Sequence, residues 1–189
     1  TQQKTKHNKP IAQMRIMHID LDYVFDTDKA QQQRNIQALI QRIQNIRPNT
    51  IFLQAFADPD ANGSADQVYF ENRYVPVRDN LFPQFLQQIR QNTQVQHVYA
   101  WLPVLAWELP KNQQFNYVQH RQGGQKGYIR LSPFEQKNLE IIVDIYRDFI
   151  QHNPVDGVLY HDDVTLSDYE DSSALAHKYY QQWGFSHRI

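Results

Sequence analysis

The sequence predicts an α/β fold, because apolar runs of strand character alternate with segments of helical periodicity along the chain. Strand alternating with helix implies parallel strands joined by right-handed crossovers. Four such units are about half of an eightfold barrel, which typically needs ~250 residues. We therefore expect a (β/α) TIM-type barrel of which this chain holds the first half, about four βα units. The predicted strands are Met14–Asp20, Thr50–Phe56, Gln96–Leu102 and Val155–Tyr160.

Helices are predicted where apolar residues recur at helical spacing. The third is expected to start with Ser132 as N-cap and Pro133 as its first residue. Gly184 is expected to close the last one. The predicted helices are Lys29–Ile46, Leu81–Gln91, Pro133–Gln151 and Ser172–Trp183. The third carries one apolar stripe, formed by Leu139, Ile142, Val143, Tyr146 and Ile150.

Two long segments, Ala57–Asn80 and Pro103–Leu131, each follow a predicted strand. Long loops after strands are where an α/β barrel keeps its function, so they favour a truncated barrel over a small open sheet. The polar start, residues 1–13, is interpreted as a linker and residues 14–189 as the barrel domain. Because the chain does not begin with methionine, we expect it to be a piece of a longer protein.

Composition excludes several classes of function. Hydrophobic residues make up 41% of the 189 residues, which indicates a globular chain. The net charge of -1 argues against a nucleic-acid or membrane-surface partner, which would need a basic surface. The absence of cysteine removes disulfides, thiol catalysis and thiolate metal sites. No apolar run approaches the ~18–20 residues of a membrane helix, and no signal peptide is recognisable.

Polar side chains cluster near the end of the first predicted strand. His18, Asp20 and Asp22 share one face if the strand runs that far. A polar face on a buried strand is costly unless it is used or paired, which favours a site. The alternative is that Asp20 or Asp22 caps a helix or pairs with an arginine. Trp101 and Trp107 are candidates for stacking on sugar rings, with core packing as the alternative for each.

The most specific local signal is Tyr160-His161-Asp162-Asp163, at the end of the fourth predicted strand. Two carboxyls in a poorly solvated site can differ in pKa, and acid/base chemistry on a glycosidic bond uses such a difference. Strand alternation sends Asp162 and Asp163 to opposite faces, so one is expected to reach substrate while the other anchors a loop. Three further carboxylates follow in the same loop, with helix capping as their alternative role: Asp168, Glu170 and Asp171.

The segment Asp58–Asp66 matches the first nine positions of an EF-hand calcium loop. The match fails at the twelfth position, where Tyr69 replaces the bidentate glutamate, and the segment follows a strand. A turn rich in aspartate and asparagine is the simpler account. Zinc is disfavoured because the histidines show no His-x-x-x-His pair and no cysteine supports them. We expect no metal.

Several segments, in this order, resemble the C-terminal glycoside-hydrolase domain of the periplasmic poly-β-1,6-N-acetyl-D-glucosamine N-deacetylase family. The similarity runs from Met14 to Phe185, nearly the whole chain, and corresponds to the N-terminal portion of that domain. The segments that carry it are Met17–Tyr23, Leu53–Asp60, Tyr99–Val104, Arg130–Phe134, Tyr160–Asp163 and Leu166–Asp171.

The resemblance implies a parent protein with a metal-dependent deacetylase domain followed by a barrel that binds and cleaves the partly deacetylated polymer from within. It implies that Asp162 and Asp163 match the acidic pair of an electronegative groove. It also implies that Tyr128 matches a tyrosine that contacts the ligand. Two departures stand out: the family's barrel continues past the point that matches Ile189, and the deacetylase half with its His pair is absent from this sequence.

These observations give one set of expected roles. We expect Asp162 or Asp163 as the general acid, with Glu170 as a lesser candidate. The expected substrate-binding residues are Asp20, Asp22, Trp101, Trp107, Tyr128, Arg130, His161 and Asp168. No cofactor is expected for this domain. The rival hypothesis is a non-catalytic module that presents the polysaccharide to the deacetylase domain.

The setting follows from the resemblance. It implies work on a biofilm exopolysaccharide in the periplasm, with association to the outer membrane through the parent protein. The expected partners are the polysaccharide, the deacetylase domain of the same parent chain and outer-membrane export machinery, with no nucleic acid.

Overall fold

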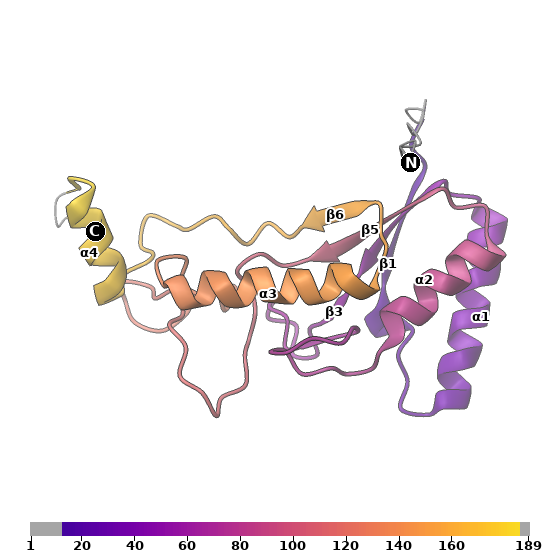
Figure 1. Ribbon diagram of the computed structural model, residues 1–189, viewed down its shortest axis with the longest axis horizontal. Helices are drawn as coiled ribbons and strands as arrows, with labels where there is room; N and C mark the ends of the chain where they lie inside the picture. Colours follow the sequence, from indigo (N-terminus) through magenta and orange to yellow (C-terminus); the bar gives the residue numbers. More distant parts are fainter. Residues whose placement is uncertain (1–12, 186–189) are drawn as a thin grey trace, which may run out of the picture.

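The computed structural model describes residues 13–185 and confirms the predicted barrel-type α/β fold (Figure 1). Four parallel strands form one sheet in the order β1-β2-β5-β6. Each predicted strand is present, and most are a few residues shorter than the apolar run that predicted them. The bounds are β1 Ile16–Asp20, β2 Thr50–Gln54, β5 His97–Leu102 and β6 Gly157–Tyr160. A second small sheet pairs β3 Phe56–Ala57 with β4 Gln67–Val68, antiparallel.

Four α-helices follow the strands, and a short 3₁₀ helix, η1, spans Leu21–Tyr23 directly after β1. Asp28 caps the first α-helix by accepting from the Ala30 amide, and Ser173 caps the last by accepting from the Ala176 amide. Gly184, just beyond the last, has the left-handed φ expected there. The bounds are α1 Lys29–Ile46, α2 Leu81–Asn92, α3 Gln136–His152 and α4 Ala174–Gln182.

The predicted start of the third helix is wrong by three residues. Helix α3 begins at Gln136, with Glu135 as its N-cap. The Ser132 hydroxyl, expected to cap this helix, instead donates to the Asp171 carboxylate at 2.7 Å. Asp171 lies far along the chain from Ser132, so the local sequence pattern could not indicate this bond in place of the helix cap.

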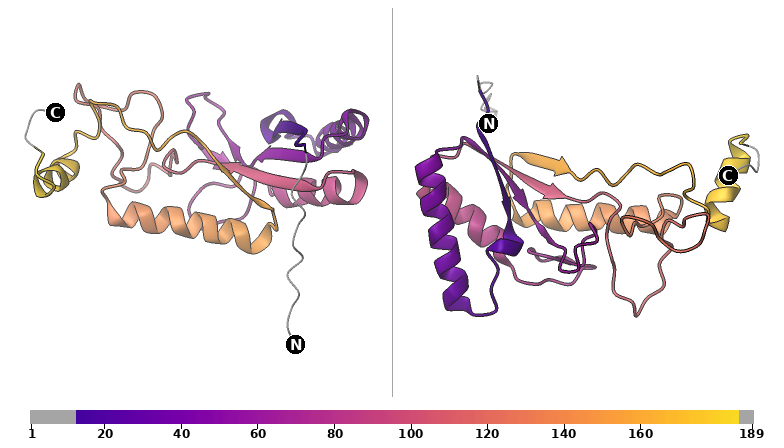
Figure 2. Two further views of the ribbon diagram at one scale, coloured as in Figure 1. Left: turned by 90° about the horizontal axis from the view of Figure 1, so that it is seen from above. Right: turned by 180° about the vertical axis from the view of Figure 1, so that it is seen from behind.

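The two faces of the sheet differ in polarity, as strand alternation requires. One face carries Ile19, Leu53 and Val98, which pack with the apolar sides of α1, α2 and α3 in the core. Figure 2 shows α3 running alongside the sheet and α1 close to α2. The other face carries His18, which is exposed, and Trp101, which is half-buried. This second face, and the loops at its carboxyl end, hold the polar residues singled out in the sequence.

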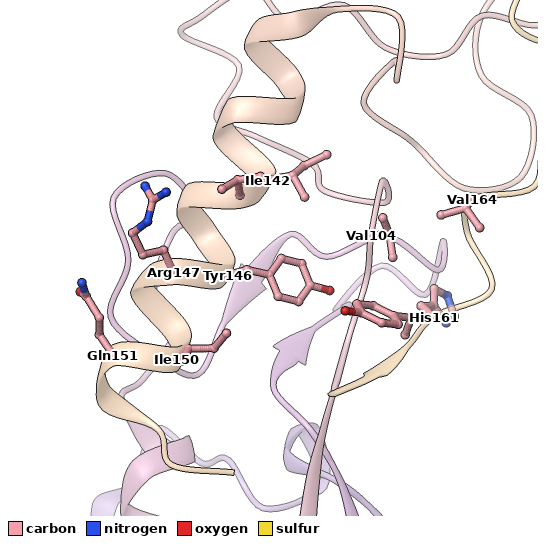
Figure 3. A pocket seen from close by; sticks show the side chains of 10 residues that line it. Val104, Ile142, Tyr146, Arg147, Ile150, Gln151, His161 and Val164 are labelled. Carbon is pink, nitrogen blue, oxygen red and sulfur yellow. The ribbon is translucent and has the colours of Figure 1, made fainter. Parts of the chain in front are cut away.

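Helix α3 has two apolar sides. Ile141, Ile145 and Phe149 enter the core. Most of the predicted stripe lies elsewhere: Val143 and Ile150 remain 53% and 59% exposed. They line an apolar cavity of about 800 Å³ between α3 and β6, towards which Tyr146 points in Figure 3. The predicted residues do form an apolar stripe, but most of it does not face the core of the described chain.

Nearly all of the predicted linker, residues 1–13, lies outside the described residues. Among residues 13–185 no helix combines the length and apolar character that crossing a membrane requires. Helix α4 lies at the opposite end of the molecule from α1 (Figure 1).

Candidate functional site

A cavity of about 530 Å³ lies at the carboxyl ends of the strands. In α/β barrels this end of the sheet carries the site, because the loops after the strands converge there. Asp20 ends β1, and His161 directly follows β6. We call this the acidic cavity. Its polar and aromatic lining includes Asp20, Asp22, Asp58, Phe56, Trp101 and His161.

The acidic cavity concentrates negative charge. Burial raises the pKa of Asp20, and the nearby carboxylates of Asp22 and Asp58 add to the rise, while the Asp22 amide opposes it. Burial also raises the pKa of Asp58, against the hydrogen bonds that it accepts from the Gly63 and Asn62 amides. Carboxylates held this way favour a cation in the cavity, because a cation relieves both burial and mutual repulsion.

Asp22 is the carboxylate with a cationic partner. Its Oδ1 lies 3.4 Å from the Arg78 guanidinium and also accepts from the Tyr69 hydroxyl, while its Oδ2 accepts from the Asp58 amide. The alternative role, in which Asp20 or Asp22 caps a helix or pairs with an arginine, therefore describes contacts that both residues make. Asp20 caps η1 by accepting from the Asp22 amide at 2.8 Å. Both still line the acidic cavity.

Aromatic rings form one wall of the acidic cavity. The Trp101 ring meets His18 edge to face at 4.5 Å, His161 at 5.3 Å and Phe56 at 5.9 Å between centroids. These contacts hold the rings in place, since such aromatic pairs contribute more stabilisation than the burial of their surface area alone. A rigid aromatic wall beside carboxylates offers a sugar ring both an apolar surface and hydrogen-bond acceptors.

Asp162 stands at the rim of the cavity beside His161. Its side chain is 84% exposed, and its Oδ1 lies 3.6 Å from His161 Nδ1. The Tyr128 hydroxyl donates to the same oxygen at 3.0 Å, and the Tyr128 ring lies 4.9 Å from the His161 ring. Tyr128, which the resemblance implied, is thus brought together with His161 and Asp162 of the predicted strand end, around one accessible carboxylate.

A glycine makes this arrangement possible. Gly63 has a left-handed φ of 88°, and a Cβ added there would lie 2.2 Å from Cε1 of Tyr128. Any side chain at this position would push the Tyr128 ring aside. The turn at Asp58–Asp66 therefore determines where the Tyr128 hydroxyl meets Asp162.

Asp163 is an anchor, which corrects its expected role as a candidate acid. It is fully buried, and its carboxylate accepts from the backbone amides of Val104, Leu105 and Ala106 at 2.6–3.1 Å. These amides belong to the loop that follows β5. Asp163 holds that loop against the end of β6 and is not available to a substrate.

Four other expected residues lie outside the acidic cavity. Glu170 and Arg130 form a buried ion pair, and Arg130 also donates to the Thr165 carbonyl at 2.7 Å. Trp107 is fully buried, and its indole N–H donates to the Val104 carbonyl. Asp168 is exposed in the loop after β6. The first three are structural, because each is buried and hydrogen bonds within the protein.

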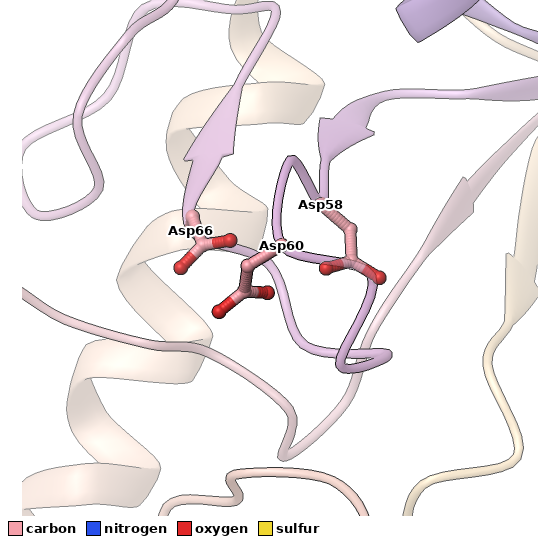
Figure 4. Close-up of side chains that lie close together, drawn as sticks. All are labelled: Asp58, Asp60 and Asp66. Carbon is pink, nitrogen blue, oxygen red and sulfur yellow. The ribbon is translucent and has the colours of Figure 1, made fainter.

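Sequence reasoning missed Asp58, which was assigned to a turn. Asp58 does stabilise the turn, because its carboxylate accepts from the Asn62 and Gly63 amides. It also lines the acidic cavity. The same rule that selected Asp20, a carboxylate at a strand end, would have selected it. Asp58, Asp60 and Asp66 also bring one carboxylate oxygen each within 4.8 Å of one another, a spacing that could hold a cation (Figure 4).

Comparison with known proteins gives consistent results. The chain is 44% identical over 179 residues to poly-β-1,6-N-acetyl-D-glucosamine N-deacetylase of Escherichia coli K12, covering 91% of this chain and 26% of that one. It therefore spans about a quarter of the length of this relative.

Among solved structures, the PgaB (BpsB) glycoside hydrolase domain from Bordetella bronchiseptica matches with a TM-score of 0.81 and 41% identity. The match covers 91% of this chain and 50% of that one. A hypothetical protein from Ruminiclostridium thermocellum, 12% identical with a TM-score of 0.58, shares the fold over 85% of this chain and 82% of its own. The model of hypothetical glycosyl hydrolase family 13 matches residues 18–189, and the chain belongs to that family.

Proposed function

We propose that this chain binds partly deacetylated poly-β-1,6-N-acetyl-D-glucosamine and takes part in its endo-hydrolysis. The single observation that carries the proposal is Asp162, an accessible carboxyl held by Tyr128 at the rim of a cavity of carboxylates and aromatic rings. Membership of a glycosyl hydrolase family and the likeness to the Bordetella domain support the reaction type. The E. coli relative's name supports the polymer.

In this proposal Asp162 is the general acid that protonates the glycosidic oxygen, and the Tyr128 hydroxyl positions it. The carboxylates of Asp20 and Asp58 accept hydrogen bonds from the ammonium of a deacetylated unit, which also relieves the burial that raises their pKa values. The rings of Trp101 and Phe56 support the apolar face of the sugar. No step draws on a cofactor.

The second candidate function is a non-catalytic module that presents the polymer to a deacetylase domain. One observation favours it: two of the three candidate acids, Asp163 and Glu170, are locked into structural hydrogen bonds. Glycosidases generally use a pair of carboxyls, about 5–5.5 Å apart when retaining and about 6.5–9.5 Å apart when inverting. A binding module would need the acidic cavity but no such pair.

Product analysis separates the two functions. The polymer is incubated with the wild-type chain, with Asp162→Asn and with Asp168→Asn, an exposed control outside the acidic cavity. Shortening by the wild type and the control that is lost in Asp162→Asn supports hydrolysis. Affinity without shortening supports the binding module. Undiminished shortening by Asp162→Asn overturns the assignment of the acid.

We propose the same setting that the resemblance implies. The polymer is a biofilm exopolysaccharide, the compartment is the periplasm, and a deacetylase domain of the same parent chain works beside this one. Export machinery in the outer membrane would receive the product. The name of the E. coli relative, of which this chain matches 26%, supports the deacetylase partner. Fractionation of cells that express the parent protein, with detection of this segment, tests the compartment.

A further inference from the structure

A second cavity, of about 510 Å³, lies beside the acidic cavity. We call it the amide cavity, because its lining includes the side-chain amides of Gln113, Gln114 and Gln125. Leu109 and Phe115, buried and half-buried, supply apolar surface in the same lining. All of these residues belong to the long loop between β5 and α3.

The two cavities meet at the turn Asp58–Asp66. Asp58 and Gly63 of this turn line the acidic cavity. Asn62 of the same turn donates to Glu108 at 3.2 Å, and Ser64 exchanges hydrogen bonds with the backbone of Ile129. Glu108 and Ile129 line the amide cavity. A polymer that occupies the acidic cavity therefore has a second recess within reach of its neighbouring units.

The chemistry of the amide cavity differs from that of its neighbour. Its charged lining residues are one acid and one base, Glu108 and Lys111, so it lacks the excess of carboxylates that favours an ammonium group. Gln113, Gln114 and Gln125 are exposed, and their side-chain amides hydrogen bond to no other described residue, so their donors and acceptors can serve a ligand. An acetamido group needs a donor, an acceptor and an apolar contact for its methyl group.

We propose that the amide cavity binds an N-acetylated aminosugar unit of the polymer, with the glutamine amides on the acetamido group and Leu109 and Phe115 against its methyl. The inference rests on the proposed function, because it takes the same polymer as ligand. It adds a basis for pattern recognition: a neutral unit in the amide cavity next to a cationic unit in the acidic cavity. Discrimination between polymers with different acetylation patterns then comes from the difference between the two cavities.

The test measures binding of two β-1,6-linked glucosamine hexasaccharides, one partly acetylated and one fully deacetylated, by calorimetry. All proteins carry Asp162→Asn, so that neither probe is cleaved. The double variant Gln114→Ala/Gln125→Ala is compared with Gln87→Ala, an exposed glutamine on α2 far from both cavities in sequence. We expect the double variant to raise the Kd of the partly acetylated probe about five- to tenfold, the value of one or two neutral hydrogen bonds. The Kd of the deacetylated probe should not change.

The outcomes are distinct. A selective loss of affinity for the acetylated probe supports the proposal. Equal affinity of the double variant and the Gln87→Ala control for that probe overturns the amide cavity while leaving the proposed function in place. An equal loss for both probes also overturns it, because the amides would then not read acetylation. Failure of every protein to bind either probe overturns the proposed function and this inference together.

Discussion

Asp162 and Asp163 are adjacent in the chain, yet their carboxylates lie in opposite environments. The Asp162 side chain is 84% exposed and accepts from the Tyr128 hydroxyl, whereas Asp163 is fully buried and accepts from three consecutive backbone amides. The alternation of side chains along β6 and its continuation produces this division. Asp162 is left accessible, while Asp163 fixes the loop after β5.

This division predicts opposite effects of two neighbouring substitutions. Asp163→Asn puts an amide N–H₂ and one remaining oxygen opposite the amides of Val104, Leu105 and Ala106, so charge-assisted hydrogen bonds are lost. We expect the free energy of unfolding to fall by about 2–3 kcal/mol. That corresponds to a fall in Tm of roughly 4–12 °C for a chain of this size.

Urea and thermal unfolding measure this difference. Asp162→Asn is the matched control, because the same change at an exposed position should stay within about 0.5 kcal/mol. If both variants were equally stable, the role of Asp163 as an anchor would be wrong.

The second prediction concerns the contact between Gly63 and Tyr128. Gly63→Ala forces the Tyr128 ring away, since its Cβ would lie 2.2 Å from the ring, and it strains a backbone with φ of 88°. Tyr128→Phe removes the hydroxyl that reaches Asp162. If the chain hydrolyses the polymer, each change should lower kcat about ten- to a hundredfold, the value of one hydrogen bond to a charged group, with little change in KM.

The double variant makes this prediction specific. Because both substitutions act on the same hydroxyl, Gly63→Ala/Tyr128→Phe should be no slower than the slower single variant. Multiplicative effects on kcat would show that Gly63 acts through something other than Tyr128.

Local patterns were enough to predict most of the fold. Helix α1 spans the predicted Lys29–Ile46, because its apolar spacing and the Asp28 cap are properties of neighbouring residues. The carboxylates at the ends of β1 and β6 were also visible as polar residues that end apolar runs. Strand alternation predicted that Asp162 and Asp163 would have different roles.

Burial of polar residues could not be predicted in this way, because the partners lie far along the chain. Asp163 meets amides 57–59 positions away, and Glu170 meets Arg130 40 positions away. Nothing in the sequence around Glu170 separates a buried ion pair from an accessible acid. Trp107 is a similar case, since a tryptophan suits a core and a sugar groove equally well.

The third prediction tests the ion pair that removed Glu170 from the site. Glu170→Gln leaves the Arg130 guanidinium buried without a counter-charge, which typically costs about 3–5 kcal/mol. Arg34→Gln is the control, because Arg34 meets Asp28 at an exposed pair 3.8 Å apart that should contribute less than about 1 kcal/mol.

Urea unfolding measures the loss in free energy of unfolding for Glu170→Gln and for Arg34→Gln. Polymer cleavage by the two variants is then compared per folded molecule at low temperature. A stable Glu170→Gln variant that had lost cleavage would restore Glu170 as a catalytic candidate.

The last prediction concerns pH and Asp66. Burial and the neighbouring Glu108 carboxylate raise the pKa of Asp66 to about 7 in the folded chain, whereas an unfolded aspartate has a pKa of about 4. The folded state therefore binds this proton more tightly than the unfolded state does. The stabilisation that results is fully present below about pH 4 and is lost as the pH rises towards about 7.

Asp66→Asn keeps this side chain neutral at every pH. We expect the free energy of unfolding of the wild type to fall relative to that of Asp66→Asn between pH 4.5 and 8, with the difference levelling off above about pH 7. Urea unfolding at several pH values checks this, in a buffer with a chelator so that no cation neutralises Asp58, Asp60 and Asp66. Asp168→Asn, an exposed aspartate away from this cluster, should track the wild type. A constant difference between Asp66→Asn and the wild type across this range would show that Asp66 does not titrate near neutrality, and that the charge at the turn is relieved in another way.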